Sequence, residues 1–217
     1  MNKEWSELNK AFQARIKKES DFAEGIETLL LLRQSLMDEL LGMKQTLSRE
    51  DFNAMPYPNA NGYHSKTIVY SVWHIFRIED IVAHDLIQND EAVFQAYRDR
   101  IGAPIITTGN ELIGKQITEF SEKLDLDALY DYVIAVKNGT DELLKLLSYK
   151  DLRKKFSEAD KTRLQQLQVV STDENACWLI DYWCGKDVSG LLRMPFSRHW
   201  IMHIEACLRI KNKLYPR

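Results

Sequence analysis

Residues 65–88 read SKTIVYSVWHIFRIEDIVAHDLIQ, and apolar side chains recur in this stretch at intervals of three and four positions. That spacing places side chains on one face of an α-helix. Ser65 is an N-cap candidate because its hydroxyl can accept a bond from a free amide of the first turn. The stretch therefore predicts one amphipathic helix with His74 near its middle and a buried stripe of Ile68, Val72, Ile75, Ile78, Val82 and Leu86.

The same periodicity extends through most of the chain, whereas alternating runs of strand length are nearly absent. Three further long helices are predicted over about residues 20–46, 125–147 and 198–214, with Asp125 and Ser197 as N-caps of the last two. Burying four apolar stripes against one another is most economical in a bundle. The expected fold class is therefore all-α, with a four-helix bundle and additional short helices.

Helix-breaking residues divide the remaining sequence. Residues 48–64 contain Met-Pro-Tyr-Pro and Asn-Gly and are predicted to form a loop. One or two helical turns are expected over residues 5–16. Thr108 to Glu111 and Ser171 to Glu174 both have the capping-box form, so each predicts the start of a short helix. Because no linker or internal repeat is evident, we expect a single domain over residues 1–217, with its bundle core over about 20–214.

Composition limits the classes of function. The chain of 217 residues is 45% hydrophobic and 28% charged, as globular proteins are. Its 29 basic and 32 acidic residues give a net charge of -3 without a basic block, which argues against nucleic acid as a partner. The apolar run at residues 29–32 is far shorter than the roughly 20 residues of a membrane span, and the N-terminus lacks a signal-peptide core. We therefore expect a cytoplasmic protein with no membrane partner.

Two of the five histidines, His199 and His203, are four residues apart in the predicted last helix. This spacing puts their rings about 40° apart in azimuth and about 6 Å apart along the axis, so both can bind one ion. A facing helix must supply a third ligand, and His74 is the best candidate. His84 lies ten residues further on and cannot share an ion with His74. The competing interpretation is that these histidines are hydrogen-bonded core residues.

Other polar and aromatic residues allow two interpretations each. Cys207 either completes a metal shell or, as we favour, is a small buried residue. Arg77, Glu79 and Asp80 either support the ligands and recognise an anion or, as favoured, form a surface ion network. Four tryptophans could wall an apolar pocket near the metal or simply fill the core, and neither interpretation is favoured: Trp73, Trp178, Trp183 and Trp200.

The order of these pieces resembles the DinB-like family of metal-dependent four-helix-bundle proteins. Residues 71–80, SVWHIFRIED, are similar to the second-helix motif of that family, in which a ligand histidine is followed by an arginine and an acidic pair. Residues 198–211, RHWIMHIEACLRIK, are similar to its last helix. The segment WCGKD at residues 183–187, leading through Pro195, looks like one branch of the family.

The resemblance implies a divalent metal, most commonly nickel or zinc with iron or manganese as alternatives, held by His74, His199 and His203. It also implies an enzyme that acts on a small-molecule substrate by thiol transfer or hydrolysis, with a low-molecular-weight thiol as one candidate partner. His199 is expected in the first turn of its helix, where the positive dipole end disfavours imidazolium. The rival hypothesis is a non-catalytic bundle that binds a ligand or partner, with structural or vestigial histidines. A homodimer is compatible with either.

Overall fold

The computed structural model describes residues 2–216, and the regular secondary structure in this range is helical. No β-strand is present in the described range, where a single bridge joins Lys155 to Asp187. The prediction of an all-α class is therefore confirmed. None of the helices in this part of the chain is long and apolar enough to cross a membrane.

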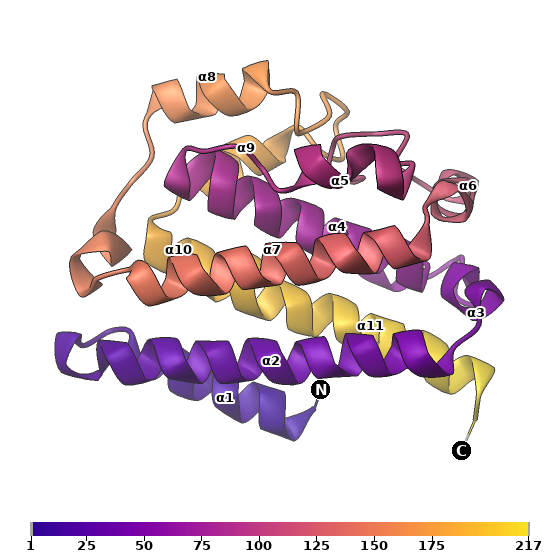
Figure 1. The fold of residues 1–217 in the computed structure, drawn as a ribbon, viewed down its shortest axis with the longest axis horizontal. Coiled ribbons are helices and arrows are strands. Elements are labelled where there is room, and N and C mark those ends of the chain that lie inside the picture. The colour runs from indigo at the N-terminus through magenta and orange to yellow at the C-terminus, as the bar shows by residue number, and fades with distance from the viewer. Residues whose placement is uncertain (1, 217) are drawn as a thin grey trace.

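Four long helical segments lie side by side and enclose the centre of the molecule (Figure 1). In the order of contact around this centre, α2 touches α7, α7 touches α4, α4 touches α11, and α11 touches α2. The segments are α2 (Phe22–Thr46), α4 (Ile68–Asp80) with its π-helical continuation η3 (Ile81–Gln88), α7 (Leu126–Leu146) and α11 (His199–Leu214). All six residues of the stripe predicted for residues 68–86 are buried in α4 and η3.

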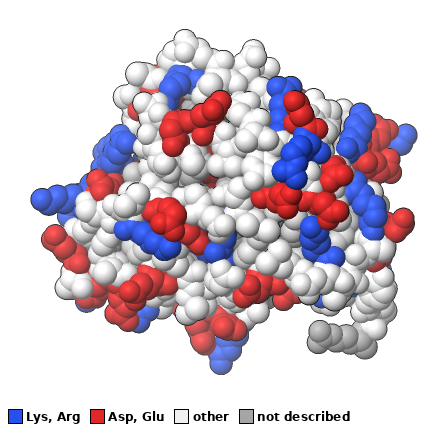
Figure 2. Space-filling view, viewed as in Figure 1, with Lys and Arg blue, Asp and Glu red and all other residues white. Residues whose placement is uncertain are grey.

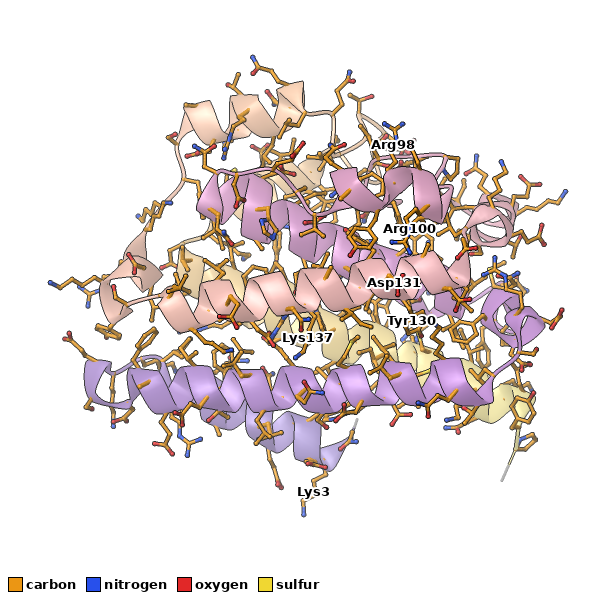
Figure 3. The ribbon with its side chains drawn as sticks, in the orientation of Figure 1. Lys3, Arg98, Arg100, Tyr130, Asp131 and Lys137 are labelled. Carbon is orange, nitrogen blue, oxygen red and sulfur yellow. The ribbon has the colours of Figure 1, made fainter. Side chains whose placement is uncertain are left out.

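Shorter helices cover this arrangement. They are α1 (Lys3–Arg15), η1 (Glu19–Asp21), α3 (Arg49–Asn53), η2 (Gly62–His64), α5 (Phe94–Ile101), α6 (Lys115–Lys123), η4 (Tyr149–Arg153), α8 (Glu158–Gln166), α9 (Trp178–Cys184), α10 (Val188–Arg193) and η5 (Met194–Arg198). In the view of Figure 3, α5 lies beside α7, to which Arg100 is tied by an ion pair of 2.7 Å with Asp131. Tyr130, also on α7, donates its hydroxyl to the Leu40 carbonyl of α2 at 3.0 Å.

The first helix is longer than the one or two turns expected, since α1 spans Lys3–Arg15 and packs along α2. Gly25 permits this close approach. A Cβ atom on Gly25 would lie 2.8 Å from Cγ2 of Ile16, a separation that packed atoms do not tolerate. The N-terminal helix therefore adds to the packing of α2 from outside the ring of four long segments.

Two N-cap predictions for the long helices have opposite outcomes. Asp125 caps α7 as predicted, because its Oδ1 accepts from the Ala128 amide at 2.8 Å. Ser65 does not cap α4. Thr67 takes that role, with its hydroxyl accepting from the Tyr70 amide at 3.0 Å, because the chain turns at η2 immediately before it.

The prediction that residues 48–64 form only a loop is wrong in part. Ser48 and Asp51 form a capping box that starts α3, and η2 adds one short turn before α4. The capping boxes predicted at Thr108 and at Ser171 do not form. Thr108 bonds instead to the side chain of Asn110, and Ser171 accepts from the Asp173 amide within a turn. Such side chains stabilise turns by the same local bonds that cap helices, so the pattern alone does not distinguish the two.

The last helix does not begin at a Ser197 cap. α10, η5 and α11 follow one another without interruption, and the Ser197 hydroxyl donates to the Leu192 carbonyl at 2.9 Å. Pro195 lacks the amide hydrogen that an α-helix would use here, which explains the wider π-helical turn. His199 consequently lies well inside a continuous helical segment, and the expected contribution of a helix N-terminus does not apply to it.

Candidate metal centre

Three histidines from two helices meet inside the ring of long segments. His74 lies on α4, and His199 and His203 lie one turn apart on α11. One nitrogen from each ring falls within 4.8 Å of the other two, and the ring centroids are 4.6 to 5.0 Å apart. All three residues are buried. We call these residues the histidine cluster, and it is the set that the sequence nominated.

Helix packing explains why the cluster forms. The four-residue spacing of His199 and His203 puts both rings on the face of α11 that contacts α4. His74 lies on the facing side of α4, so that its ring packs against both partners. The other two histidines are outside the cluster: His84 bonds to the Asp90 carboxylate at 2.9 Å, and the His64 ring lies against the Tyr63 ring at a tilt of 41°.

Hydrogen bonding fixes the orientation of His74. Its Nδ1 lies 2.8 Å from the carbonyl oxygen of Thr108, which can only accept, so Nδ1 carries the proton and Nε2 keeps its lone pair. A backbone carbonyl bonded to the far nitrogen is the usual support of a metal-binding histidine. Nδ1 of His199 and Nδ1 of His203 are buried without a hydrogen-bond partner among the described residues. Such orphaned nitrogens are rare in protein interiors.

Burial sets the protonation state of the cluster. It lowers the pKa of His74 to about 4, against a partial opposing effect of the bond to Thr108. Burial also lowers the pKa of His199 and of His203 well below the usual value, and the neighbouring rings add to the effect. All three imidazoles are therefore neutral at pH 7, which is the form that binds a metal.

The residues present fit a divalent transition metal. Imidazole nitrogens suit zinc, nickel, copper and iron, whereas magnesium and calcium prefer oxygen ligands, and the cluster offers no carboxylate. Nitrogens bound tetrahedrally to one zinc ion lie about 3.4 Å apart. The three ligand nitrogens of the cluster lie within 4.8 Å of one another, which is at most about 1.5 Å more than that value. Small ring rotations can close this difference.

Cys207 is not part of the cluster. The residue is fully buried, and burial raises the pKa of its thiol to about 12. A thiol with so high a pKa is protonated and unreactive. Cys207 therefore fits the favoured interpretation of a small core residue.

Residues on either side of His74 anchor the loop that covers the cluster. Tyr70 Oη and Arg77 Nε each donate to a carbonyl oxygen of the segment 103–114 at 2.8 Å, on either side of Thr108. Since these residues and His74 lie at intervals of three and four on α4, one helix face holds three successive parts of the loop. The loop is thereby fixed against His74 of the histidine cluster.

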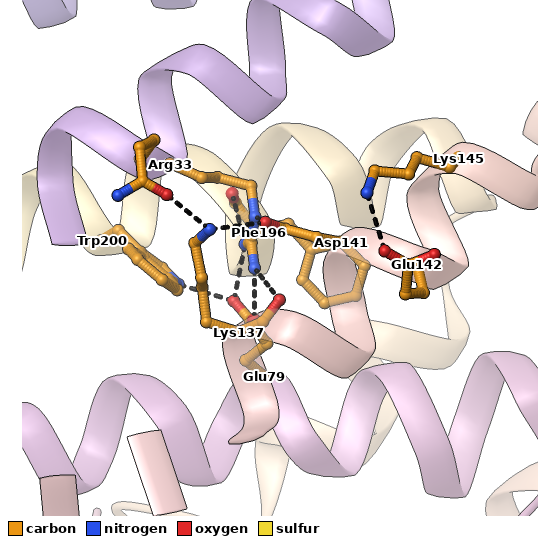
Figure 4. Close-up of polar contacts among 9 residues, drawn as sticks. Arg33, Glu79, Lys137, Asp141, Glu142, Lys145, Phe196 and Trp200 are labelled. Atoms are coloured by element: carbon orange, nitrogen blue, oxygen red, sulfur yellow. Dashed lines mark hydrogen bonds and ion pairs between the residues drawn. The ribbon is translucent and has the colours of Figure 1, made fainter. Parts of the chain in front are cut away.

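A buried ionic network links all four long segments (Figure 4). Arg33 of α2 binds both carboxylate oxygens of Glu79 at 2.7 and 2.9 Å and one oxygen of Asp141 at 2.7 Å. Lys137 pairs with the other oxygen of Asp141, and Trp200 Nε1 donates to Glu79 at 2.6 Å. Burial by itself would lower the pKa of Arg33. The combined attraction of the two carboxylates has a larger effect and holds this pKa above its usual value.

The favoured interpretation of Arg77, Glu79 and Asp80 as a surface network is wrong, because all three are buried. Asp80 accepts bonds from the amides of Val93 and Phe94, and from the Tyr132 hydroxyl, each at 2.9 Å. These carboxylates fix helices around the site and do not touch the cluster. Sequence analysis missed Arg33, whose signal is a lone basic residue within an otherwise apolar helical stripe.

Two cavities flank the histidine cluster. A polar cavity of about 400 Å³ is reached by His74 and His203, and its lining includes Tyr63, Ser65, Lys66 and Asn110. An apolar cavity of about 200 Å³ is reached by His74 and His199, and its lining includes Ile78, Trp178, Leu179, Tyr182, Trp183 and Pro195. The pocket interpretation therefore holds for Trp178 and Trp183. Trp73 and Trp200 instead fill the core.

Comparison with models of known protein families and with curated proteins finds no match for this chain. On the face shown in Figure 2, basic and acidic side chains are interspersed, and neither sign forms an extended area. A functional assignment therefore depends on the histidine cluster and the cavities beside it.

Proposed function

We propose that this protein is a metal-dependent enzyme of the DinB-like four-helix-bundle type. In this proposal the histidine cluster holds one divalent ion, nickel or zinc in the first place and iron or manganese otherwise. The enzyme acts on a small molecule by thiol transfer or hydrolysis. The observation that carries the proposal is the convergence of three buried, neutral imidazoles beside two cavities.

The number and surroundings of the ligands favour a catalytic over a structural role. Structural zinc sites are closed by four protein ligands, whereas catalytic sites have three and leave a position for water or substrate. The cluster supplies three ligands, and two cavities reach it. When bound, a divalent ion with neutral ligands supplies Lewis-acid activation and lowers the pKa of a thiol or of water.

The chain's own residues provide orientation and exclusion of water. The Thr108 carbonyl fixes the His74 ring, and the Glu79 carboxylate holds Trp200, which directly follows His199. The ring of Trp183, 1% exposed, closes the inner wall of the apolar cavity. Rigidly oriented ligands beside an apolar cavity are an arrangement that favours electrostatic catalysis.

The test is metal content. The protein, purified without an affinity tag and loaded with nickel, zinc, iron or manganese in turn, is expected to bind about one ion per chain, as three convergent ligands predict. His74→Ala, His199→Ala and His203→Ala should each lose the ion, as measured by elemental mass spectrometry. His84→Ala is the matched control, since His84 lies on the same continuous helix but bonds to Asp90.

Circular dichroism and thermal unfolding of the metal-free variants distinguish loss of the site from loss of the fold. Near-native unfolding of metal-free His203→Ala, combined with lost metal, supports the proposal. Wild-type protein that takes up none of the four metals would refute it and favour the non-catalytic, ligand-binding bundle. Metal retained by all three cluster variants would also refute it.

A further inference from the structure

The two cavities meet at the histidine cluster but differ in chemistry. His74 and Asn110 line both, whereas His203 faces the polar cavity and His199 the apolar one. A molecule that approaches the cluster therefore meets polar groups on one side and aromatic and aliphatic surfaces on the other. Such a division favours a ligand with two unlike ends.

Lys66 determines the charge preference of the polar cavity. Of the described residues that line it, Lys66 alone is charged at neutral pH, and none is acidic. Its Nζ lies over the Tyr70 ring at 4.7 Å and donates a long bond of 3.4 Å to the Leu112 carbonyl. Glu111, on the adjacent loop, bonds to Thr107 and does not line the cavity. The ammonium group thus lacks an anionic partner in this space.

Electrostatics strengthens this preference. Burial lowers the pKa of Lys66, which means that the surroundings do not compensate its charge fully. His74 and His203 reach the same cavity as Lys66, so the ammonium group and the cluster share one space. A divalent ion at the cluster would add positive charge to the same space. An anion is the ligand that these groups stabilise together.

Aromatic side chains form much of the apolar cavity. Trp183 and Leu179 are buried at its inner end, and Trp178, 49% exposed, lies at its rim next to Tyr182. An exposed indole at the mouth of an apolar cavity gains contact area when an apolar group enters. No described residue that lines this compartment is an acid, a lysine or an arginine.

We propose that the substrate is a small amphipathic carboxylate, with its carboxylate beside Lys66 and its apolar group between Trp178 and Trp183. Asn110 is the positioning residue between the two ends. The Thr108 hydroxyl bonds to its Oδ1 at 2.8 Å, which leaves the amide nitrogen to donate to a bound ligand. The assignment deepens the proposed function and rests on it for the reaction, but the two compartments can be tested without any metal.

The test compares three probes of one shape by isothermal titration calorimetry, in metal-free and metal-loaded protein: phenylbutyrate, phenylbutanol and phenylbutylamine. The wild type is expected to bind the anion about tenfold more tightly than the neutral alcohol, as one charge-assisted contact allows, and the amine least. In the metal-free protein, Lys66→Gln should abolish this preference, whereas in the metal-loaded protein the bound ion should retain part of it. The matched control is Lys3→Gln, because Lys3 is 91% exposed on α1 and should leave it unchanged (Figure 3).

Trp178→Ala tests the other end. The substitution should weaken the binding of the anion and that of the alcohol by the same factor, about tenfold for the loss of an aromatic contact. The ratio of the two affinities should stay unchanged. Equal binding of alcohol and anion by the wild type, or an unchanged ratio of the two affinities in metal-free Lys66→Gln, would overturn the carboxylate site. Unchanged affinity in Trp178→Ala would overturn the apolar site, and a wild type that binds no probe would overturn both.

Failure of the proposed function gives a different result. A chain that takes up no metal refutes the metalloenzyme, yet an anion preference that depends on Lys66 in that metal-free chain still supports the carboxylate site. Conversely, full metal loading without any anion preference would leave the metal centre standing and refute the substrate class.

Discussion

Replacing Glu79 by glutamine should destabilise the protein strongly, although the substitution preserves the shape of the side chain. Glu79 and Asp141 balance Arg33 and Lys137, so the network carries no net charge. Glu79→Gln removes one negative charge and leaves the fully buried guanidinium of Arg33 undercompensated. The amide oxygen can still accept from Trp200 Nε1, so the variant changes the charge more than the number of hydrogen bonds.

The magnitude follows from burial. Removing one partner of a buried ion pair costs about 3–5 kcal/mol, because the remaining charge stays out of water without its counterion. A control is available on α7, where Glu142 pairs with Lys145 and both side chains are more than half exposed. Such a surface pair contributes about 0–1 kcal/mol, so Glu142→Gln should change the unfolding free energy little.

Urea denaturation at pH 7, followed by circular dichroism, measures both variants. A double-mutant cycle adds the single variant Arg33→Met and the double variant Arg33→Met with Glu79→Gln. Because the double variant removes both charges of the pair, its loss should fall short of the sum of the single losses by about 2 kcal/mol or more. A Glu79→Gln loss below about 1 kcal/mol, or strict additivity in the cycle, would refute the assignment of Glu79 as the counterion of Arg33.

Two further predictions concern titration and thiol chemistry. The folded-state pKa of His74, about 4, lies below its unfolded value of about 6.5, so its contribution to the stability of the metal-free protein is complete above pH 6.5 and is lost as the pH falls towards 4. Between pH 6.5 and pH 4, the free energy of unfolding should fall by roughly 3 kcal/mol through this residue, as measured by urea denaturation, and His74→Leu should reduce this fall. A wild-type stability that does not depend on pH in this range would contradict the prediction. With a thiol reagent such as Ellman's reagent, native protein should react at the exposed Cys177 alone, whereas Cys184 and Cys207, whose burial raises the pKa to about 11 and about 12, should react only after unfolding. Three equally fast thiols would contradict the burial of the latter two.

Local sequence signals were reliable where one helix face decides the structure. The periodicity of residues 68–88 predicted a continuous buried helix, and the cap at Asp125 was identified correctly. The other predicted caps were wrong. Ser65, Thr108 and Ser171 lie in turns or have other bonding partners, and Ser197 lies inside a continuous helical segment. A short polar side chain bonds to whichever backbone group the loop presents, and the loop path depends on distant contacts.

The acidic residues of α4 show why burial could not be predicted. Glu79 and Asp80 look like surface residues in a linear pattern, but each meets a partner from a remote part of the chain. Glu79 depends on Arg33, 46 positions away, and Asp80 on Tyr132, 52 positions away. Buried charges require such partners, and only the assembled helices identify them.

The sequence by itself determined the helical class and nominated His74, His199 and His203, because periodicity and a four-residue spacing are properties of single helices. The tertiary structure brought these rings together, buried them and lowered their pKa values. It also decided that Lys66 and Trp178 line two different cavities beside the cluster. The physical reason is that a helix fixes the face on which a side chain lies, whereas packing fixes what that face meets and how much water remains there.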